Sequence, residues 1–269
     1  KGTRRIRNVL KLKLSDDVKK NQPEIKIKKD FYAQHQLLTE IIANDMDDLI
    51  NALNENVADL VARYEAMEWK REFYRHKEES NDVVKNRLIK DFGISLELPK
   101  HAKYEIGKQK FAKIMFPDRS RQIDFQAGDG GTSKANFIYS GLMIWELKYT
   151  DQSQFTPEFL MRARDTVLKY NALHEFPGVY MGTQDHPAVL PVHKWIKIGD
   201  VEGYEFKGLY KFTGRFEPSG GKFWSFHFVH PIRKTIIAIS GYVDAPPTMN
   251  PAADLRKIQR VIYSLKIHQ

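Results

Sequence analysis

The residues best suited to chemistry are charged side chains near the middle of the chain. Asp118 or Asp124 is followed by Glu146-Leu147-Lys148. A carboxylate on one strand and Glu-x-Lys on the next is the arrangement of a metal-dependent nuclease, in which the carboxylates hold the cation and the lysine orients the attacking water. Glu-x-Lys is also common at exposed strand ends, and such nucleases usually carry a helix before the first strand. The nuclease is therefore an alternative, and not the favoured hypothesis.

Other catalytic and metal-binding patterns are weak. His227 and His230 are three residues apart on a predicted strand, so their side chains point to opposite faces. The chain has no cysteine, which excludes disulfides, thiolate nucleophiles and cysteine zinc sites. It also has no Gly-x-Ser-x-Gly motif of a serine hydrolase. We therefore predict no catalytic residue, no metal site and no cofactor.

Four side chains are candidates for binding instead. Arg164 lies at the edge of the apolar stripe of a predicted helix, where it either covers the rim of the core or contacts a ligand or partner. Trp145, Trp195 and Trp224 are interpreted as core or interface residues. They would also suit an aromatic-lined cleft for a glycan or a peptide, because Tyr and Trp dominate such surfaces.

A predicted strand and helix between residues 136 and 170 must position most of these candidates. The strand from Asn136 to Tyr149 is apolar on both faces as far as Ile144, which is typical of a strand covered on each side. In the helix that follows, Thr156 is the expected N-cap and Pro157 takes the first position, where its missing N–H costs nothing. This pair of elements is expected to organise the fold.

The remaining patterns predict an α+β fold in two parts after a basic segment, residues 1–23. A small α/β subdomain over residues 24–92 contains two short strands, a long helix from Asn44-Asp45 to about Tyr74, and a second helix that ends before Gly93. A sheet-and-helix domain over residues 93–269 contains a Gly-rich connection at 128–133, an antiparallel meander and a last helix that starts after Asn250-Pro251.

Composition and charge limit the class of protein. Apolar residues make up 42% of the 269 residues, enough for a core, and no apolar run reaches the roughly 18 residues of a membrane-spanning helix. Residues 1–30 hold eleven Lys and Arg against four Asp and Glu, so +7 of the net charge of +9 lies there. A membrane-surface tether, a solvated tail or an anion-binding module would each explain this. Nucleic acid is disfavoured, because the body lacks a basic stripe interleaved with aromatics.

Several segments resemble a known family. They are Lys29–Gln36, Phe92–Pro99, Phe137-Ile138-Tyr139, the helix from Phe155 to Lys169, and Gly208-Leu209-Tyr210. Together they are similar to the uncharacterised Bacteroidetes envelope lipoproteins grouped as domain of unknown function 4837, over roughly Asn8 to Leu265. Residues 93–269 also resemble the layout of the Mog and PsbP-like fold. The family has no assigned activity, so it supplies no functional residues.

The resemblance implies a signal peptide and a lipidated cysteine, which this cysteine-free sequence does not contain. We therefore expect a non-enzymatic, lipid-anchored binding or accessory protein that faces the periplasm. Its expected partners are the membrane surface, through the anchor, and an envelope protein or glycan. A hydrolase such as the nuclease, and an anion-binding module acting through the basic N-terminus, remain the alternatives.

Overall fold

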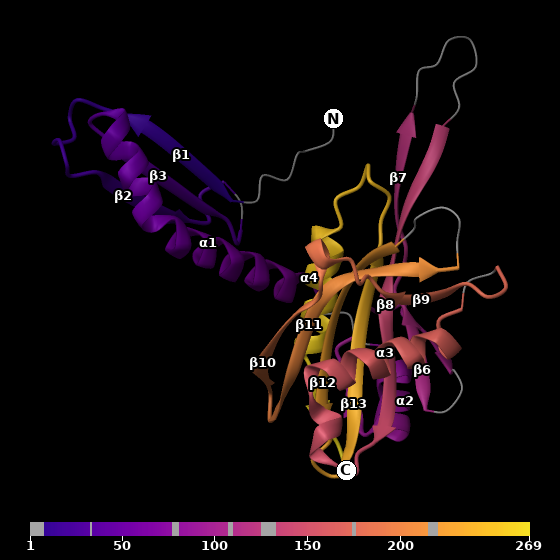
Figure 1. The fold of residues 1–269 in the computed structure, drawn as a ribbon. Helices are drawn as coiled ribbons and strands as arrows, with labels where there is room; N and C mark the ends of the chain where they lie inside the picture. Colours follow the sequence, from indigo (N-terminus) through magenta and orange to yellow (C-terminus); the bar gives the residue numbers. More distant parts are fainter. Residues whose placement is uncertain are drawn as a thin grey trace. The chain divides into compact units, whose positions relative to one another are not determined.

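The computed structural model describes residues 8–32, 34–76, 81–106, 110–124, 133–173, 176–214 and 220–269. The chain divides into two compact units, Lys1–Lys77 and Glu78–Gln269. The first is coloured indigo to purple in Figure 1, and the second continues from purple to yellow. Each unit has secondary structure of both kinds, so the predicted α+β class is confirmed.

The first unit is a three-stranded sheet with one long helix. β1 (Val9–Leu14) runs parallel to the central β3 (Leu37–Ala43), and β2 (Glu24–Lys29) runs antiparallel to β3 on its other side. The helix α1 (Met46–His76) is capped as predicted, because Asp45 Oδ1 accepts the Asp48 N–H at 2.9 Å. Its buried side chains Leu49, Ala52 and Leu60 pack against Ile41 and Ala43 of β3.

The helix α2 (Asp82–Phe92) belongs to the second unit, although its sequence pattern suggested that it belongs to the first. Ser80-Asn81-Asp82 predicts the start of this helix and Gly93 predicts its end. In the structure Asn81 Oδ1 accepts the Val84 N–H, and Gly93 ends the helix in the left-handed region at φ 69°. Its three buried side chains, Val84, Leu88 and Phe92, join the larger core cluster of the second unit. Sequence periodicity identifies a helix but not the sheet on which it packs.

A nine-stranded antiparallel sheet forms the second unit, in the order β10-β11-β12-β13-β8-β6-β5, with β7 paired to β8 and β9 paired to β11. Its strands are β5 (Lys103–Ile106), β6 (Phe111–Met115), β7 (Arg119–Asp124), β8 (Ser133–Lys148), β9 (Tyr180–Thr183), β10 (Val192–Ile198), β11 (Val201–Thr213), β12 (Gly220–Val229) and β13 (Thr235–Asp244). The alternating sequence pattern predicted this meander.

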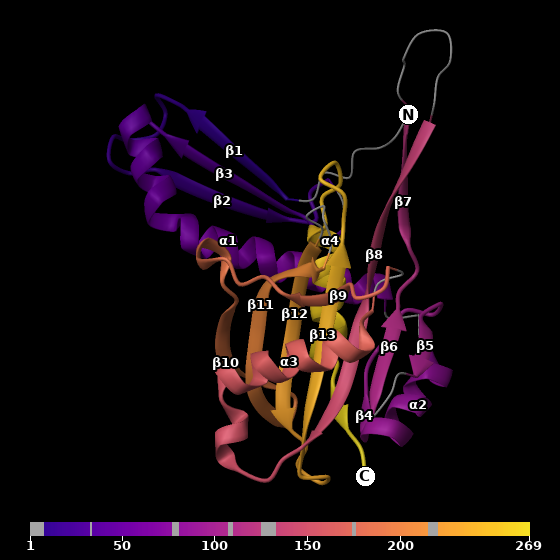
Figure 2. The same ribbon diagram turned by 45° about the vertical axis from the view of Figure 1, so that its right-hand side comes forward.

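Helices cover both faces of this sheet (Figure 2). The helix α3 (Pro157–Asn171) lies on one face, where its Leu160 and Leu168 pack with β8, β11, β12 and β13. The helices α2 and α4 (Ala252–Tyr263) lie on the other face and contribute to the larger core cluster. We call these the α3 face and the α4 face. The short 3₁₀ helix η1 (Gln152–Phe155) lies between β8 and α3 in the sequence, and η2 (Pro187–Val189) lies between β9 and β10.

The strand β8 is central to the second unit, as its sequence predicts. It pairs with β13 on one side and with β6 and β7 on the other. Alternation sends successive side chains to separate faces: Leu142 and Ile144 lie in the α4-face core, and Met143 and Trp145 lie in the α3-face core. The predicted cap of α3 is also present, with Thr156 Oγ1 accepting the Phe159 N–H at 3.3 Å.

One expected strand is shorter in the structure, and two predicted segments lie wholly or partly outside the described residues. The alternation of Ile94–Pro99 predicts a single strand, but only Ile94–Ser95 is a strand, β4, paired with β14 (Lys266–Ile267); Leu96 and Leu98 are nevertheless buried. Most of the Gly-rich connection at 128–133, and residues 1–7 of the basic segment, lie outside the described residues.

Candidate functional site

Glu146 is a buried carboxylate held by three side chains on the α4 face. Its oxygens accept hydrogen bonds from Lys110 Nζ at 2.8 Å, Arg233 Nη2 at 3.0 Å and Thr235 Oγ1 at 2.6 Å. Burial opposes ionisation, but the hydrogen bonds from Lys110 and Thr235 and the charge of Arg233 keep the pKa of Glu146 below its ordinary value. Glu146 is therefore an anion with both oxygens engaged, and not the solvated strand end that its sequence suggested.

The metal-dependent nuclease hypothesis is wrong. Arg119, next to Asp118, pairs with Ile138 of β8, and Asp124 pairs with Ser133. Glu146 lies eight and thirteen residues further along the same strand, which at about 3.3 Å per residue corresponds to roughly 25 and 40 Å. No single cation can bridge carboxylates so far apart. The reason is register, because β7 pairs with the first half of β8 and Glu146 lies in the second half.

His227 and His230 point to different surroundings, as their spacing predicts. His227 lies on the α3 face beside Trp145, and the His230 ring contacts the Gly93 carbonyl oxygen at 3.1 Å. Among the residues that the structure describes, no group of three or more His, Asp or Glu side chains could hold a metal ion. Within the described residues, no helix is both long enough and apolar enough to cross a membrane.

Arg164 is fully buried between α3 and the sheet. Its guanidinium lies 4.0 Å from the centroid of the Phe223 ring, and Nη1 donates to Thr183 Oγ1 at 2.7 Å. Asp165 accepts hydrogen bonds from both the N–H and the hydroxyl of Thr183, at 2.8 and 2.6 Å. Burial lowers the pKa of Arg164 to about 10, so it remains a cation at neutral pH. The interpretation of Arg164 as a structural residue fits best, because it ties α3 to β9.

A buried polar strip continues from Arg164 across the α3 face. Burial, and then the charge of Arg164, lowers the pKa of His227 to about 3, so its imidazole is neutral. His227 contacts Ser225 at 3.2 Å, and Trp145 packs edge-on against it with ring centroids 5.7 Å apart. Trp145 is thus a core residue and cannot reach a partner at the surface.

Trp224 belongs to a cluster on the α4 face around the buried carboxylate of Glu205. Glu205 Oε1 accepts hydrogen bonds from Trp224 Nε1 and from the Tyr263 hydroxyl, each at 2.8 Å. Its Oε2 lies 3.3 Å from both Lys194 Nζ and Lys207 Nζ, and Lys207 also lies 4.0 Å from the centroid of the Trp224 ring. Trp224 is therefore committed to internal contacts, as Trp145 is. Glu205 was not predicted, because it carries no local signal apart from its place in an alternating strand.

Trp195 is different, because 52% of it is exposed. It projects from β10 on the α3 face and packs edge-on against Tyr204 and Phe155, with ring centroids 4.9 and 6.0 Å apart. A row of ring contacts continues inward from Tyr204 through Phe206 to His227. The rings beneath Trp195 hold its position while leaving half of its surface accessible. Of the predicted binding residues, Trp195 alone presents a large accessible aromatic surface.

The strand that carries Trp195 is an edge strand. Within the described residues, β10 pairs with β11 and has no neighbour on its other side, and all its residues before Ile196 are exposed. Exposed apolar side chains continue along it and along the segment before it: Val189, Leu190, Val192 and Trp195. An apolar strand edge with unpaired N–H and C=O groups is a template for pairing with another chain. Trp145 lies in the core and Trp224 bonds to Glu205, so the two do not line one aromatic cleft with Trp195, which was the alternative to core or interface roles.

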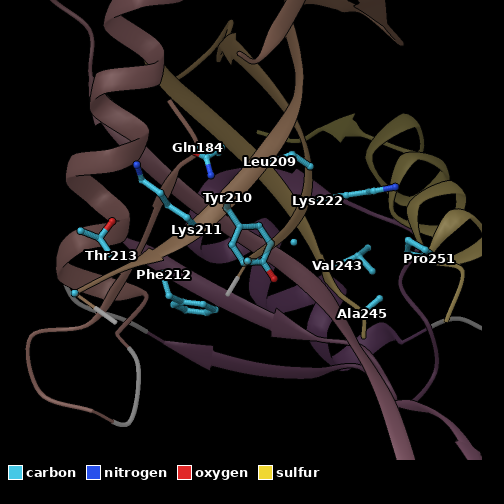
Figure 3. Close-up of a pocket in the computed structure, with 13 residues that line it drawn as sticks. Gln184, Leu209, Tyr210, Lys211, Phe212, Thr213, Lys222, Val243, Ala245 and Pro251 are labelled. Atoms are coloured by element: carbon cyan, nitrogen blue, oxygen red, sulfur yellow. The ribbon is translucent and has the colours of Figure 1, made fainter. Parts of the chain in front are cut away.

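A separate pocket of about 630 Å³ lies at the far end of β11 (Figure 3). Tyr210 lies in the middle of its lining residues, with Lys211 and Phe212 beside it and Val243 opposite. Burial raises the pKa of Tyr210 well above its ordinary value. The hydroxyl is thus a neutral hydrogen-bonding group rather than a base, and the charged side chains among the described lining residues are Lys211 and Lys222.

The sequence of the second unit matches an established family. The model of the family described as Domain of unknown function (DUF4837) matches residues 80–264, which is more than half of the chain. The chain belongs to this family. A second model, also described as Domain of unknown function (DUF8532), matches residues 1–77. The segment Lys29–Gln36 therefore falls in the DUF8532 match, although the resemblance assigned it to the DUF4837 family.

The comparison with solved structures finds only distant similarity. Two solved structures similar to this DUF4837 protein are a mutant of the protein Mog1 and the Ran-binding protein Mog1p of Saccharomyces cerevisiae. Each is 10% identical, covers 62% of this chain and 96% of its own, and superposes with a TM-score of 0.29. No curated protein matches the sequence.

Proposed function

We propose that this DUF4837 protein is a non-enzymatic binding or accessory protein of the cell envelope, and that it binds an extended segment of a partner protein along β10. The observation that carries the proposal is the open, apolar edge of β10 with the half-exposed Trp195. An added strand would gain main-chain hydrogen bonds from the edge and specificity from alternate side chains. Trp195 would act as the aromatic anchor.

The charges of β10 favour an acidic and apolar partner segment. Lys194 and Lys197 are exposed on this strand, and Val192 and Trp195 supply apolar contacts. Lysines on an edge strand also discourage pairing between identical copies, because like charges would then face each other. Val192 and Lys194 lie on one face of the strand, and Trp195 and Lys197 lie on the other. A segment with both an apolar and an acidic residue on each of its faces therefore matches the edge.

Peptide binding to the purified chain tests this proposal. The probe is a set of ten-residue peptides in which two apolar residues are followed by two acidic ones, so that each face of the extended peptide carries both kinds. Scrambled peptides of equal charge serve for comparison. Binding is followed by fluorescence anisotropy, and hydrogen exchange records which amides become protected. We expect protection of the β10 amides, and a loss of about tenfold or more in affinity for Trp195→Ala, because it removes the central aromatic contact.

Tyr170→Ala is the matched control, since Tyr170 is 65% exposed on α3, away from β10. It should bind the peptides as the unchanged chain does. Equal losses for both variants, or binding without protection of β10, would contradict strand addition. If the chain instead binds glycans on an array, and this binding requires Trp195 but protects no β10 amide, the result would favour a glycan as the partner.

The envelope localisation and the lipid anchor rest on the family resemblance. They are tested with the full-length gene product in its native cell. We expect it to fractionate with envelope membranes, and to be released when a lipidatable cysteine encoded upstream is replaced by serine. Recovery in the cytosolic fraction would contradict the proposed compartment without affecting the proposed β10 interaction.

A further inference from the structure

One face of the small sheet in the first unit concentrates positive charge. Alternation places Lys11 and Lys13 of β1 and Lys26 and Lys28 of β2 on the same face as Glu40 of β3. This face is opposite to the one covered by α1, which carries Ile41 and Ala43. We call it the lysine face. Within the first unit it is a surface of four cations around one central carboxylate.

Glu40 has three lysine neighbours, but its single negative charge does not neutralise the lysine face. Its oxygens lie 3.2 Å from Lys13 Nζ, 3.5 Å from Lys28 Nζ and 4.0 Å from Lys11 Nζ. The hydrogen bond from Lys13 outweighs burial and lowers the pKa of Glu40, so the carboxylate is ionised. Lys26 pairs with Glu24 at 2.6 Å. Four lysines against two carboxylates leave an excess of positive charge, and 38–52% of each lysine side chain is exposed.

Two exposed aromatic side chains adjoin the lysine face. Phe31 is 49% exposed and Tyr32 is 58% exposed, and their rings meet edge-on with centroids 4.7 Å apart. Lys28 Nζ lies 5.1 Å from the centroid of the Phe31 ring, and Lys11 Nζ donates to the Tyr32 hydroxyl at 3.1 Å. Cationic and aromatic groups therefore form one continuous surface.

We propose that the lysine face, with Phe31 and Tyr32, binds directly to the surface of an anionic lipid bilayer. Lysine ammonium groups are flexible point charges, which suit phosphates scattered over a plane better than one bidentate ligand. Aromatic side chains that combine an apolar ring with a polar neighbourhood suit the membrane interface.

A bilayer fits this surface better than a nucleic acid does. Binding of unpaired bases uses aromatic faces on which the bases stack. Here the Phe31 and Tyr32 rings are perpendicular to each other, Lys28 Nζ lies 5.1 Å from the Phe31 centroid, and Lys11 bonds to the Tyr32 hydroxyl. Two perpendicular rings cannot both stack on successive bases that lie parallel to each other. Headgroup phosphates can instead contact the lysines where they are.

Vesicle co-sedimentation with the full 269-residue chain tests the proposal. The probes are phosphatidylcholine vesicles with and without about one third phosphatidylglycerol, at low and moderate salt. We expect binding only to the anionic vesicles, weakened by salt. Replacing Lys11, Lys13, Lys26 and Lys28 by Gln should weaken binding roughly tenfold or more. Each basic residue near an anionic surface contributes up to about fivefold, and the carboxylates of Glu24 and Glu40 reduce the contribution of these four.

The matched control replaces four exposed lysines of the second unit by Gln: Lys90, Lys100, Lys169 and Lys266. It lowers the net charge equally, and residues 1–7 are unchanged in both variants. Equal weakening by the two sets would overturn the assignment to the lysine face. Tight binding to soluble polyphosphate or single-stranded RNA, with no preference for anionic vesicles, would overturn the assignment to a bilayer.

Glu40→Gln separates a binding surface from a structural ion-pair cluster. Removing the central negative charge should strengthen binding to anionic vesicles by about threefold or more, because the lysines are then less neutralised. A purely structural cluster predicts lower stability and unchanged vesicle binding, which would overturn the proposal. Since the chain used carries no lipid, the result is independent of the proposed anchor and of β10.

Discussion

At the scale of single residues, Glu146 shows how burial and charge together assign a role. Its carboxylate is ionised and bonded to Lys110, Arg233 and Thr235, with 2% of the side chain exposed. Glu146→Gln removes the counter-charge of two cations that the fold brings to this point. We expect the free energy of unfolding at pH 7 to fall by about 1–3 kcal/mol, less than for a fully buried pair because Lys110 is half-exposed. Urea titration measures this loss.

The pKa of Glu146 fixes the direction of its pH dependence. Because the folded protein lowers this pKa from its ordinary value of 4.5, the stabilisation is complete above that value and is lost as pH falls through the folded pKa. The difference in stability between the unchanged chain and Glu146→Gln should therefore shrink below about pH 4. A difference that persists undiminished at pH 3 would show that packing of the side chain, and not its charge, stabilises the fold.

Arg164 allows charge and packing to be compared at one buried position. Arg164→Met keeps most of the side-chain stem beside Phe223 and removes the guanidinium, whereas Arg164→Ala also leaves a cavity. Asp165, which is partly exposed, can still bond to Thr183 in both variants. We expect Arg164→Ala to lose about 2 kcal/mol more stability than Arg164→Met, because of the cavity. Equal losses in urea titration would assign the stabilisation to the guanidinium instead.

At the scale of elements, the close packing of α4 on β13 depends on Gly241, which has no side chain. A Cβ atom on Gly241 would lie 2.1 Å from Ile258 Cγ2. Gly241→Ala should therefore push α4 from the sheet and cost about 1–3 kcal/mol. In the Ile258→Ala background the same substitution should cost clearly less, because the clashing atom is gone. A double-mutant cycle in urea measures this coupling, and strict additivity would contradict the packing argument.

Elements could be predicted where their signals are local. Asp45, Asn81 and Thr156 cap three of the four expected helices, because a cap involves only neighbours along the chain. The alternation of β8 likewise indicated its two buried faces. The distance between Asp118 and Glu146 could not be predicted, since it depends on which half of β8 pairs with β7. The isolation of Trp195 from Trp145 and Trp224 depends on non-local pairing in the same way.

At the scale of the whole molecule, the division into units depends on where helices pack. The sequence contains a change of pattern at Gly93, whereas the structure divides after Lys77. The helix α2 between these points has polar residues beside its apolar side chains, and its periodicity suits either sheet. Because its buried side chains pack in the α4-face core, α2 belongs to the second unit. Such contacts join residues that are far apart in the sequence, so the pattern of a short segment cannot predict them.

Two fragments distinguish these boundaries. Fragment 78–269 contains α2 and every buried residue of both large core clusters, so we expect it to unfold cooperatively with a native near-ultraviolet circular dichroism spectrum. Fragment 93–269 lacks Val84, Leu88 and Phe92. Each of these side chains contributes roughly 1.5–3 kcal/mol on burial, and their combined loss is comparable with the roughly 5–15 kcal/mol that stabilises a typical domain. The shorter fragment should therefore lose its near-ultraviolet spectrum or unfold at a much lower urea concentration. Equal cooperativity and midpoints for the two fragments would mean that the core of the second unit does not need α2.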